Sequence, residues 1–355
     1  MPEISESSMN GDSERSYFRP VPCDRALPGV LTLAGTIVGF REVEVLNRSA
    51  PSQVLPADAV RAMYPHQAVV LDALVGTRPN QCGLTMDRPR IMGIVNVTPD
   101  SFSDGGGLPS TQAAVDHAGA LIEAGANLLD IGGESTRPGA EPVSVHEEAD
   151  RVLPVIEALV ASGCSTPISV DTRNAPVARQ ALASGARMFN DVSALVHDPA
   201  SIDVARDART VCLMHALGSP QTMQQNPVYD DVLLDVYDYL EYRVAACEMA
   251  GIGREHLVID PGIGFGKTVA HNIALIRGLS LFHGLGCPVM LGASRKGFIG
   301  RLGGEPEADK RAPGSISAAL AGAQAGAHIL RVHDVAETVQ AVRVWQAITE
   351  NEVGA

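Results

Sequence analysis

The 355-residue chain is 45% hydrophobic and 19% charged, a composition typical of a globular protein. No uncharged apolar run approaches the roughly 20 residues of a membrane helix, and the N-terminus has no signal-peptide pattern, so we expect a cytoplasmic protein without a membrane partner. The formal net charge of −14 disfavours nucleic-acid binding. An anionic ligand would therefore need local Lys, Arg or a metal ion to reverse the field at its site.

The N-terminal quarter of the chain has little regular pattern. Residues 1–16 are rich in Ser, Glu and Asp, which predicts a disordered tail. Residues 29–46 are rich in Val, Ile, Leu and Thr around Gly35 and Gly39, which predicts a hairpin or two short strands. The stretch from there to about residue 80 predicts no element.

From residue 90 onward, short apolar runs alternate with longer stretches of helical periodicity. Eight strands are predicted, at 91–95, 128–131, 168–170, 187–189, 211–214, 257–259, 289–291 and 328–332. The clearest helices are predicted at 111–124, 147–162, 175–184, 232–250 and 315–325. Eight such units in about 260 residues favour a closed α/β barrel, the (β/α)₈ or TIM barrel, over the alternative of an open doubly wound sheet.

The carboxyl ends of the predicted strands carry polar side chains, and active sites of such barrels form there. Helix capping accounts for a single Asp or Asn, but cations disfavour helix N-termini, so capping does not explain the basic groups. Asp171, Asn190 and Asp260 are acceptor-rich and suit the donor edge of a flat heterocycle. The donors Lys296, Arg331 and His333 suit phosphate oxygens.

A magnesium ion is the cofactor expected at such a site. Asn96, at the end of the first barrel strand, offers one neutral oxygen ligand. Because one neutral ligand holds Mg²⁺ weakly, we expect the ion to arrive with a diphosphate.

Three loops invite further interpretation. Residues 98–107 and 132–142 are long enough to be mobile lids, with ordinary exposed connectors as the alternative. Residues 262–268 end in Gly-Lys-Thr after a strand, as a phosphate-binding loop does. Only three residues separate the first Gly from the Gly-Lys pair where four are needed, so this interpretation is disfavoured.

The ordered motifs MGIVNVTPDSFSDGG, DIGGESTRPGA, VDT, NDV, MH, DPGIGFGK, SRK and RVHD resemble those of the dihydropteroate synthases over about residues 82–350. The resemblance implies a transferase of folate biosynthesis that condenses (7,8-dihydropterin-6-yl)methyl diphosphate with 4-aminobenzoate. It implies pterin contacts at Asp171, Asn190, Asp260 and Lys296 with Met214 nearby, and a diphosphate group at Asn96, Arg331 and His333. The aminobenzoate pocket would be bordered by Phe102, Thr136, Arg137, Pro138, Phe265 and Lys296. It also implies a homodimer.

Two departures from the family pattern concern substrate affinity. Ala216-Leu217-Gly218 stands where the family often has Met-Gln-Gly, and Gly297 stands where it often has Ser. A backbone N–H at a helix start would be the substitute for the lost hydroxyl. The alternatives are a pterin-binding methyltransferase that uses a corrinoid, or a non-catalytic paralogue. The expected organisation is a tail at 1–16, an N-terminal extension of unknown role at 17–81 and a pterin-binding barrel at 82–350.

Overall fold

The computed structural model describes residues 15–98, 110–135, 143–218 and 222–350. Its centre is a parallel eight-stranded sheet in the order β10-β9-β8-β7-β6-β5-β12-β11. A parallel bridge between Ile259 and Val289 joins the two ends of this order and leaves a nearly closed ring. The predicted (β/α)₈ barrel is therefore confirmed, and the open sheet is excluded. The strands are β5 (Arg90–Asn96), β6 (Leu128–Gly132), β7 (Ile168–Asp171), β8 (Met188–Asp191), β9 (Thr210–Met214), β10 (Leu257–Asp260), β11 (Met290–Leu291) and β12 (Ile329–Val332).

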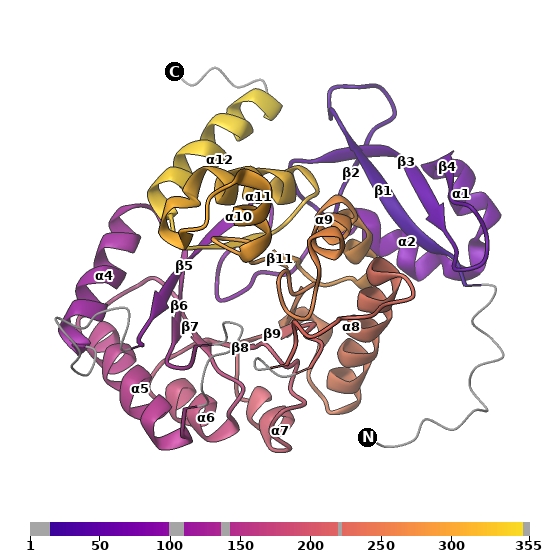
Figure 1. The fold of residues 1–355 in the computed structure, drawn as a ribbon. Coiled ribbons are helices and arrows are strands. Elements are labelled where there is room, and N and C mark those ends of the chain that lie inside the picture. Colours follow the sequence, from indigo (N-terminus) through magenta and orange to yellow (C-terminus); the bar gives the residue numbers. More distant parts are fainter. Residues whose placement is uncertain (1–14, 99–109, 136–142, 219–221, 351–355) are drawn as a thin grey trace.

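Helices surround the barrel on the outside (Figure 1). They bury apolar stripes against the sheet, and several begin at a capping side chain, as where Ser144 and Asp231 accept backbone N–H groups at the starts of α5 and α8. All five helices predicted from periodicity are present. No helix within the described ranges is long and apolar enough to cross a membrane. The helices are α4 (Thr111–Glu123), α5 (Val145–Ala161), α6 (Ala175–Ala183), α7 (Ser201–Ala205), α8 (Val232–Met249), α9 (Val269–Arg277), α10 (Gly297–Gly303), α11 (Ala312–Gln324) and α12 (Val335–Glu350).

The barrel interior changes character along its axis. Strand residues two apart point the same way, so each strand sends alternate side chains inward. Toward the amino ends these side chains form an apolar cluster, closed below by Cys82 and Met86, of Met92, Leu128, Met188, Cys212, Val258, Met290 and Ile329. One or two inward positions further on, Asp130, Asn190 and Asp260 are buried. The barrel interior therefore has an apolar layer toward the amino ends and, above it, a polar layer of Asp130, Asn190 and Asp260, which we call the polar floor.

The N-terminal extension is a small sheet with two helices. It consists of β1 (Tyr17–Cys23), β2 (Leu31–Thr32), β3 (Gly39–Leu46), β4 (Gln53–Pro56), α1 (Ala57–Met63) and α2 (Ala68–Val75). β2 and β3 pair antiparallel, which confirms the strands predicted in 29–46. Sequence patterns missed β1, β4, α1 and α2: β1 contains Pro20 and Pro22, the other three are short, and both helices begin without a side-chain cap.

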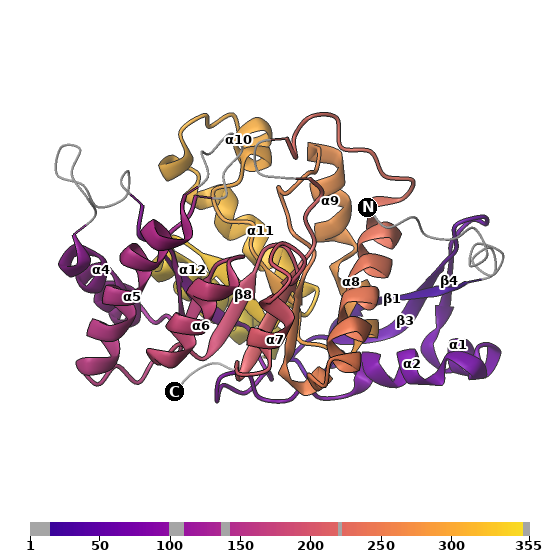
Figure 2. The same ribbon diagram turned by 90° about the horizontal axis from the view of Figure 1, so that it is seen from below.

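The extension packs against the barrel. Its helix α2 lies at the opposite end of the barrel from α10 (Figure 2). The buried guanidinium of Arg78 donates to the carbonyls of Gly76 and Ala73 in the extension and of His283 and Cys287 in the barrel. Arg15, which the sequence assigns to the tail, pairs with acidic side chains of α8. Arg15 therefore belongs with the folded extension.

Candidate active site

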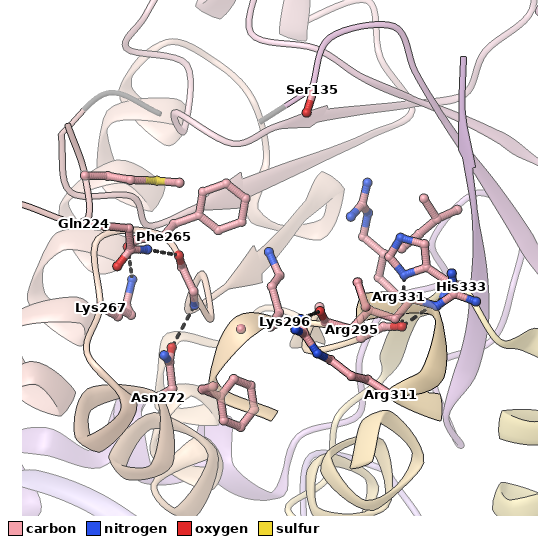
Figure 3. Close-up of a pocket in the computed structure, with 18 of the residues that line it drawn as sticks. Ser135, Gln224, Phe265, Lys267, Asn272, Arg295, Lys296, Arg311, Arg331 and His333 are labelled. Atoms are coloured by element: carbon pink, nitrogen blue, oxygen red, sulfur yellow. Dashed lines mark hydrogen bonds between the residues drawn. The ribbon is translucent and has the colours of Figure 1, made fainter. Parts of the chain in front are cut away.

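A cavity of about 780 Å³ opens at the carboxyl ends of the barrel strands. Its walls come from the loops after β5, β6, β9, β10, β11 and β12, which are far apart in sequence. In Figure 3 the Lys296 side chain extends between Phe265 on one side and Arg331 and His333 on the other. The predicted site residues that line the cavity are Asn96, Asp171, Phe265, Lys296, Arg331 and His333.

Three other predicted residues are buried just beneath this lining. The Asn190 amide donates to Asp130 at 3.1 Å. The Asp260 carboxylate accepts the backbone N–H of Gly262 at 2.7 Å. Met214 packs in a small apolar cluster with Phe265. The remaining predicted residues, Phe102, Thr136, Arg137 and Pro138, lie outside the described part of the chain.

Arg331 is held at the floor of the cavity by two carboxylates. Its Nε donates to Asp130 at 2.5 Å and its Nη2 donates to Asp171 at 2.6 Å. Burial lowers the pKa of Arg331, but the two carboxylates raise it more, so the guanidinium stays charged. Asp130 was given no role in the sequence analysis, although an acidic residue inside an apolar strand was a signal that could have found it.

Burial disfavours the charged form of the neighbouring acids. It raises the pKa of Asp171, with Arg331 acting in the opposite direction. It also raises the pKa of Asp260, against the hydrogen bond from Gly262 and the nearby Lys296. Desolvated carboxyl groups at fixed positions are suited to hydrogen-bond the N–H edge of a flat heterocycle.

The charges lining the cavity are opposite in sign to those of the whole chain. Among the described residues, the lining holds six basic side chains and two acidic ones, although the chain carries a net charge of −14. The acidic ones are Glu134 and Asp171, and the basic ones are Lys267, Arg295, Lys296, Arg301, Arg311 and Arg331. This local reversal is what an anionic ligand requires.

Comparison with known proteins assigns the chain to a family. A model of the family described as "Pterin binding enzyme" matches residues 92–333. The chain belongs to this family. Dihydropteroate synthase of Escherichia coli K12 is 48% identical over 264 residues, which are 74% of this chain and 93% of the relative. The Neisseria meningitidis MC58 enzyme is 50% identical over 272 residues, 75% of this chain and 95% of the relative.

Solved structures of pterin-binding enzymes agree with the observed barrel. Xanthomonas albilineans dihydropteroate synthase with 4-aminobenzoic acid is 53% identical, covers 76% of this chain and 97% of its own, and gives a TM-score of 0.71. The same enzyme in complex with 7,8-dihydropteroate gives a TM-score of 0.68 at 51% identity, over 75% of this chain and 95% of its own. The chain is therefore a transferase of the dihydropteroate synthase type within the pterin-binding family.

The glycine-rich loop of this pterin-binding enzyme is not a phosphate-binding loop. The Nζ of Lys267 is buried and contacts Nδ1 of His215 and the carbonyl of Phe265, so protein groups already engage this ammonium. The cation that faces the cavity beside this loop is instead Lys296, whose Nζ lies 4.0 Å from the centre of the Phe265 ring. The sequence did not predict this contact between the Lys267 ammonium and the Phe265 carbonyl.

Of the two departures from the family pattern, Gly297 lines the cavity, whereas Leu217 is not among the described lining residues. Leu217 is partly exposed, and Gly266 approaches it so closely that a Cβ on Gly266 would collide with its backbone. Gly297 begins α10, and a Cβ built there meets nothing within 4 Å. The space for a serine side chain is therefore present although the hydroxyl is not.

Proposed function

We propose that this protein is a dihydropteroate synthase, which joins (7,8-dihydropterin-6-yl)methyl diphosphate to 4-aminobenzoate and releases diphosphate. Membership of the family and the names of its relatives support the reaction type. The observation that carries the proposal is the excess of cations in the cavity of an acidic protein, because both substrates are anions.

In the proposed reaction the bond between the pterin methylene carbon and the diphosphate oxygen breaks, and the electron pair leaves with diphosphate. The amine nitrogen then bonds to the methylene carbon and loses one proton. Lys296, Arg331 and His333, which line the cavity, are assigned in this proposal to stabilising the charge that grows on the leaving group. Asp171, Asn190 and Asp260 hold the pterin, Met214 packs beneath it, and no protein nucleophile is required.

The second substrate is placed by the loops above the floor. Phe265 forms one wall of its pocket, beside Lys296. Phe102, Thr136, Arg137 and Pro138 complete the pocket in this proposal. Each substrate thus meets a separate group of side chains, with Lys296 between them.

Mg²⁺ is proposed to enter with the diphosphate. The described residues include no group of three or more His, Cys, Asp or Glu that could hold a metal ion. Asn96 lines the cavity and provides one neutral oxygen, which fits an ion that takes most of its ligands from diphosphate and water. The ion would neutralise the leaving group. A cytoplasmic homodimer is proposed for the whole protein, on family resemblance.

The product identifies the reaction. Purified protein, the pterin diphosphate, 4-aminobenzoate and Mg²⁺ should yield a species with the mass of 7,8-dihydropteroate, and chelation of Mg²⁺ should slow its formation. Recovery of unchanged pterin diphosphate, bound but not converted, would instead indicate the non-catalytic paralogue. A corrinoid absorbance that saturates on titration would favour the methyltransferase.

A further inference from the structure

Side chains fix the glycine-rich loop after β10 at several of its peptide groups. The Gly262 N–H donates to Asp260 at 2.7 Å, and the Gly264 N–H donates to Asn272 at 2.7 Å. The Gly264 carbonyl accepts the amide of Gln224 at 2.6 Å (Figure 3). A loop whose backbone groups are each paired in this way has few alternative conformations.

Lys267 also fixes this loop, through buried contacts of its side chain. Its side chain is only 3% exposed, and its Nζ lies 3.0 Å from the Phe265 carbonyl, 2.9 Å from Nδ1 of His215 and 3.3 Å from the His215 carbonyl. His215 follows β9 and Phe265 follows β10. The ammonium group therefore ties together two neighbouring loops at the rim of the barrel.

The partners of Lys267 are unusual for a buried cation. No salt bridge to Lys267 occurs within the described ranges, and its three contacts are to neutral groups. Burial lowers the pKa of Lys267 to about 7, with nearby Lys296 acting in the same direction and Asp260 against it. Methionine would fill the same space without this desolvation cost, so stability alone does not account for a lysine here.

The fixed carbonyl belongs to the residue whose side chain forms a wall of the cavity. Phe265 is 9% exposed, and its ring packs on Met214, Val192 and Met223 while the opposite surface meets the Lys296 ammonium. Holding the Phe265 carbonyl fixes the backbone that carries this ring. The ring in turn sets one side of the space that Lys296 occupies.

We propose that Lys267 is a positioning residue: its hydrogen bonds to Phe265 and His215 hold the Phe265 ring where it borders the second substrate. The inference rests on the proposed synthase function. It predicts that loss of the ammonium loosens the amine subsite and leaves the pterin floor in place, because the floor residues of β6, β7, β8, β10 and β12 have hydrogen bonds that do not involve Lys267.

The test is Lys267→Met in the full-length protein. We expect the KM for 4-aminobenzoate to rise about ten-fold or more, with kcat falling less than about three-fold and the Kd for the pterin diphosphate unchanged. The control is Lys310→Met, which removes an exposed lysine paired with Glu307 and should change none of these. Equal losses in pterin and amine binding, or wild-type kinetics, would overturn the proposal.

A second variant covers the case in which Lys267→Met does not fold. Tyr229→Phe keeps the ring and removes only the hydroxyl that donates to the Gly266 carbonyl at 2.8 Å in the same loop. It should raise the amine KM by about two- to five-fold without affecting pterin binding. An unchanged KM for 4-aminobenzoate in this variant would contradict the proposal that hydrogen bonds to the glycine-rich loop position the amine subsite. An inactive wild type would refute the synthase function, and the positioning role with it.

Discussion

The two ends of the barrel bury polar groups in different ways. At the amino end, the Arg78 guanidinium donates hydrogen bonds to backbone carbonyls. His283 and His328 are fully buried between the extension and the barrel. At the carboxyl end, Arg331 is paired with Asp130 and Asp171 but still faces a cavity. The first arrangement joins the extension to the barrel, and the second leaves a charged group lining a cavity.

This difference separates stability from function within one barrel. The Arg78 guanidinium at the amino end donates to four backbone carbonyls, so removing it should cost folding free energy and leave kinetics unchanged. The cations that line the cavity at the carboxyl end are proposed to stabilise the transition state, so removing one should lower the rate and leave folding nearly intact. Each prediction below tests one side of this division.

The largest effect is expected from Lys296→Ala. Lys296 lines the cavity beside Phe265 and is proposed to contact both substrates, so its loss should lower kcat/KM by about 1,000-fold or more. The melting temperature should change little because the side chain is only half-buried. Steady-state kinetics and thermal melts provide the two measurements, with Lys310→Ala as the exposed control. Full activity in Lys296→Ala would remove this residue from the mechanism.

The opposite pattern is expected from Arg78→Met at the amino end. Four carbonyls lose their donor, which should reduce the free energy of unfolding by about 3 kcal/mol. Denaturant titration measures this loss, and Arg61→Met, which breaks an exposed pair with Asp72, is the matched control. A change in kcat of the folded Arg78→Met protein would show that the two ends are coupled.

The buried histidines should make the amino end sensitive to acid. Burial lowers the pKa of His283 to about 3 from the ordinary value of 6.5, so the unfolded chain takes up a proton that the folded chain refuses. Stability from this residue is complete above about pH 6.5 and is lost as the pH falls toward 3. His283→Gln should therefore lose less stability than the wild type between pH 7 and pH 5. Parallel losses in urea titrations at the two pH values would contradict this.

The smallest effect is expected from Gly297→Ser. The added side chain has open space at the start of α10 and supplies the hydroxyl that the family resemblance leads us to expect there. The KM for 4-aminobenzoate should fall by about two- to five-fold, with stability unchanged or slightly improved by the better helix former. A raised KM would mean that the cavity has adapted to glycine at this position.

The barrel could be predicted from the sequence because the pattern of an apolar strand followed by a helix is repeated eight times. Each strand ends in polar residues, and parallel strands of a barrel all end at the same face, so Asp171, Asn190 and Arg331 could be placed together from sequence alone. The extension lacked such repetition. Its core forms between β1, β3 and α2, which no local period reveals.

Pairings inside the site were not predictable from sequence for a related reason. Asp130 and Arg331 are 201 residues apart, and their contact depends on inward positions of two strands that meet only after the barrel forms. The spacing around Lys267 disfavoured a phosphate-binding motif but gave the residue no other role, whereas in the fold its ammonium contacts His215, 52 residues earlier. Residue types at strand ends predict which charged and hydrogen-bonding groups the site contains. Which of these groups pair with one another depends on the folded barrel.

The account depends most directly on one rate: diphosphate release by the wild-type protein at saturating pterin diphosphate and Mg²⁺, measured as 4-aminobenzoate is raised from zero. We predict slow release without the amine and a saturable increase with it, matched by dihydropteroate formed in equal amount. Release that ignores the amine, or pterin binding without release, would contradict the assignment of the carboxyl-end cavity as a synthase active site.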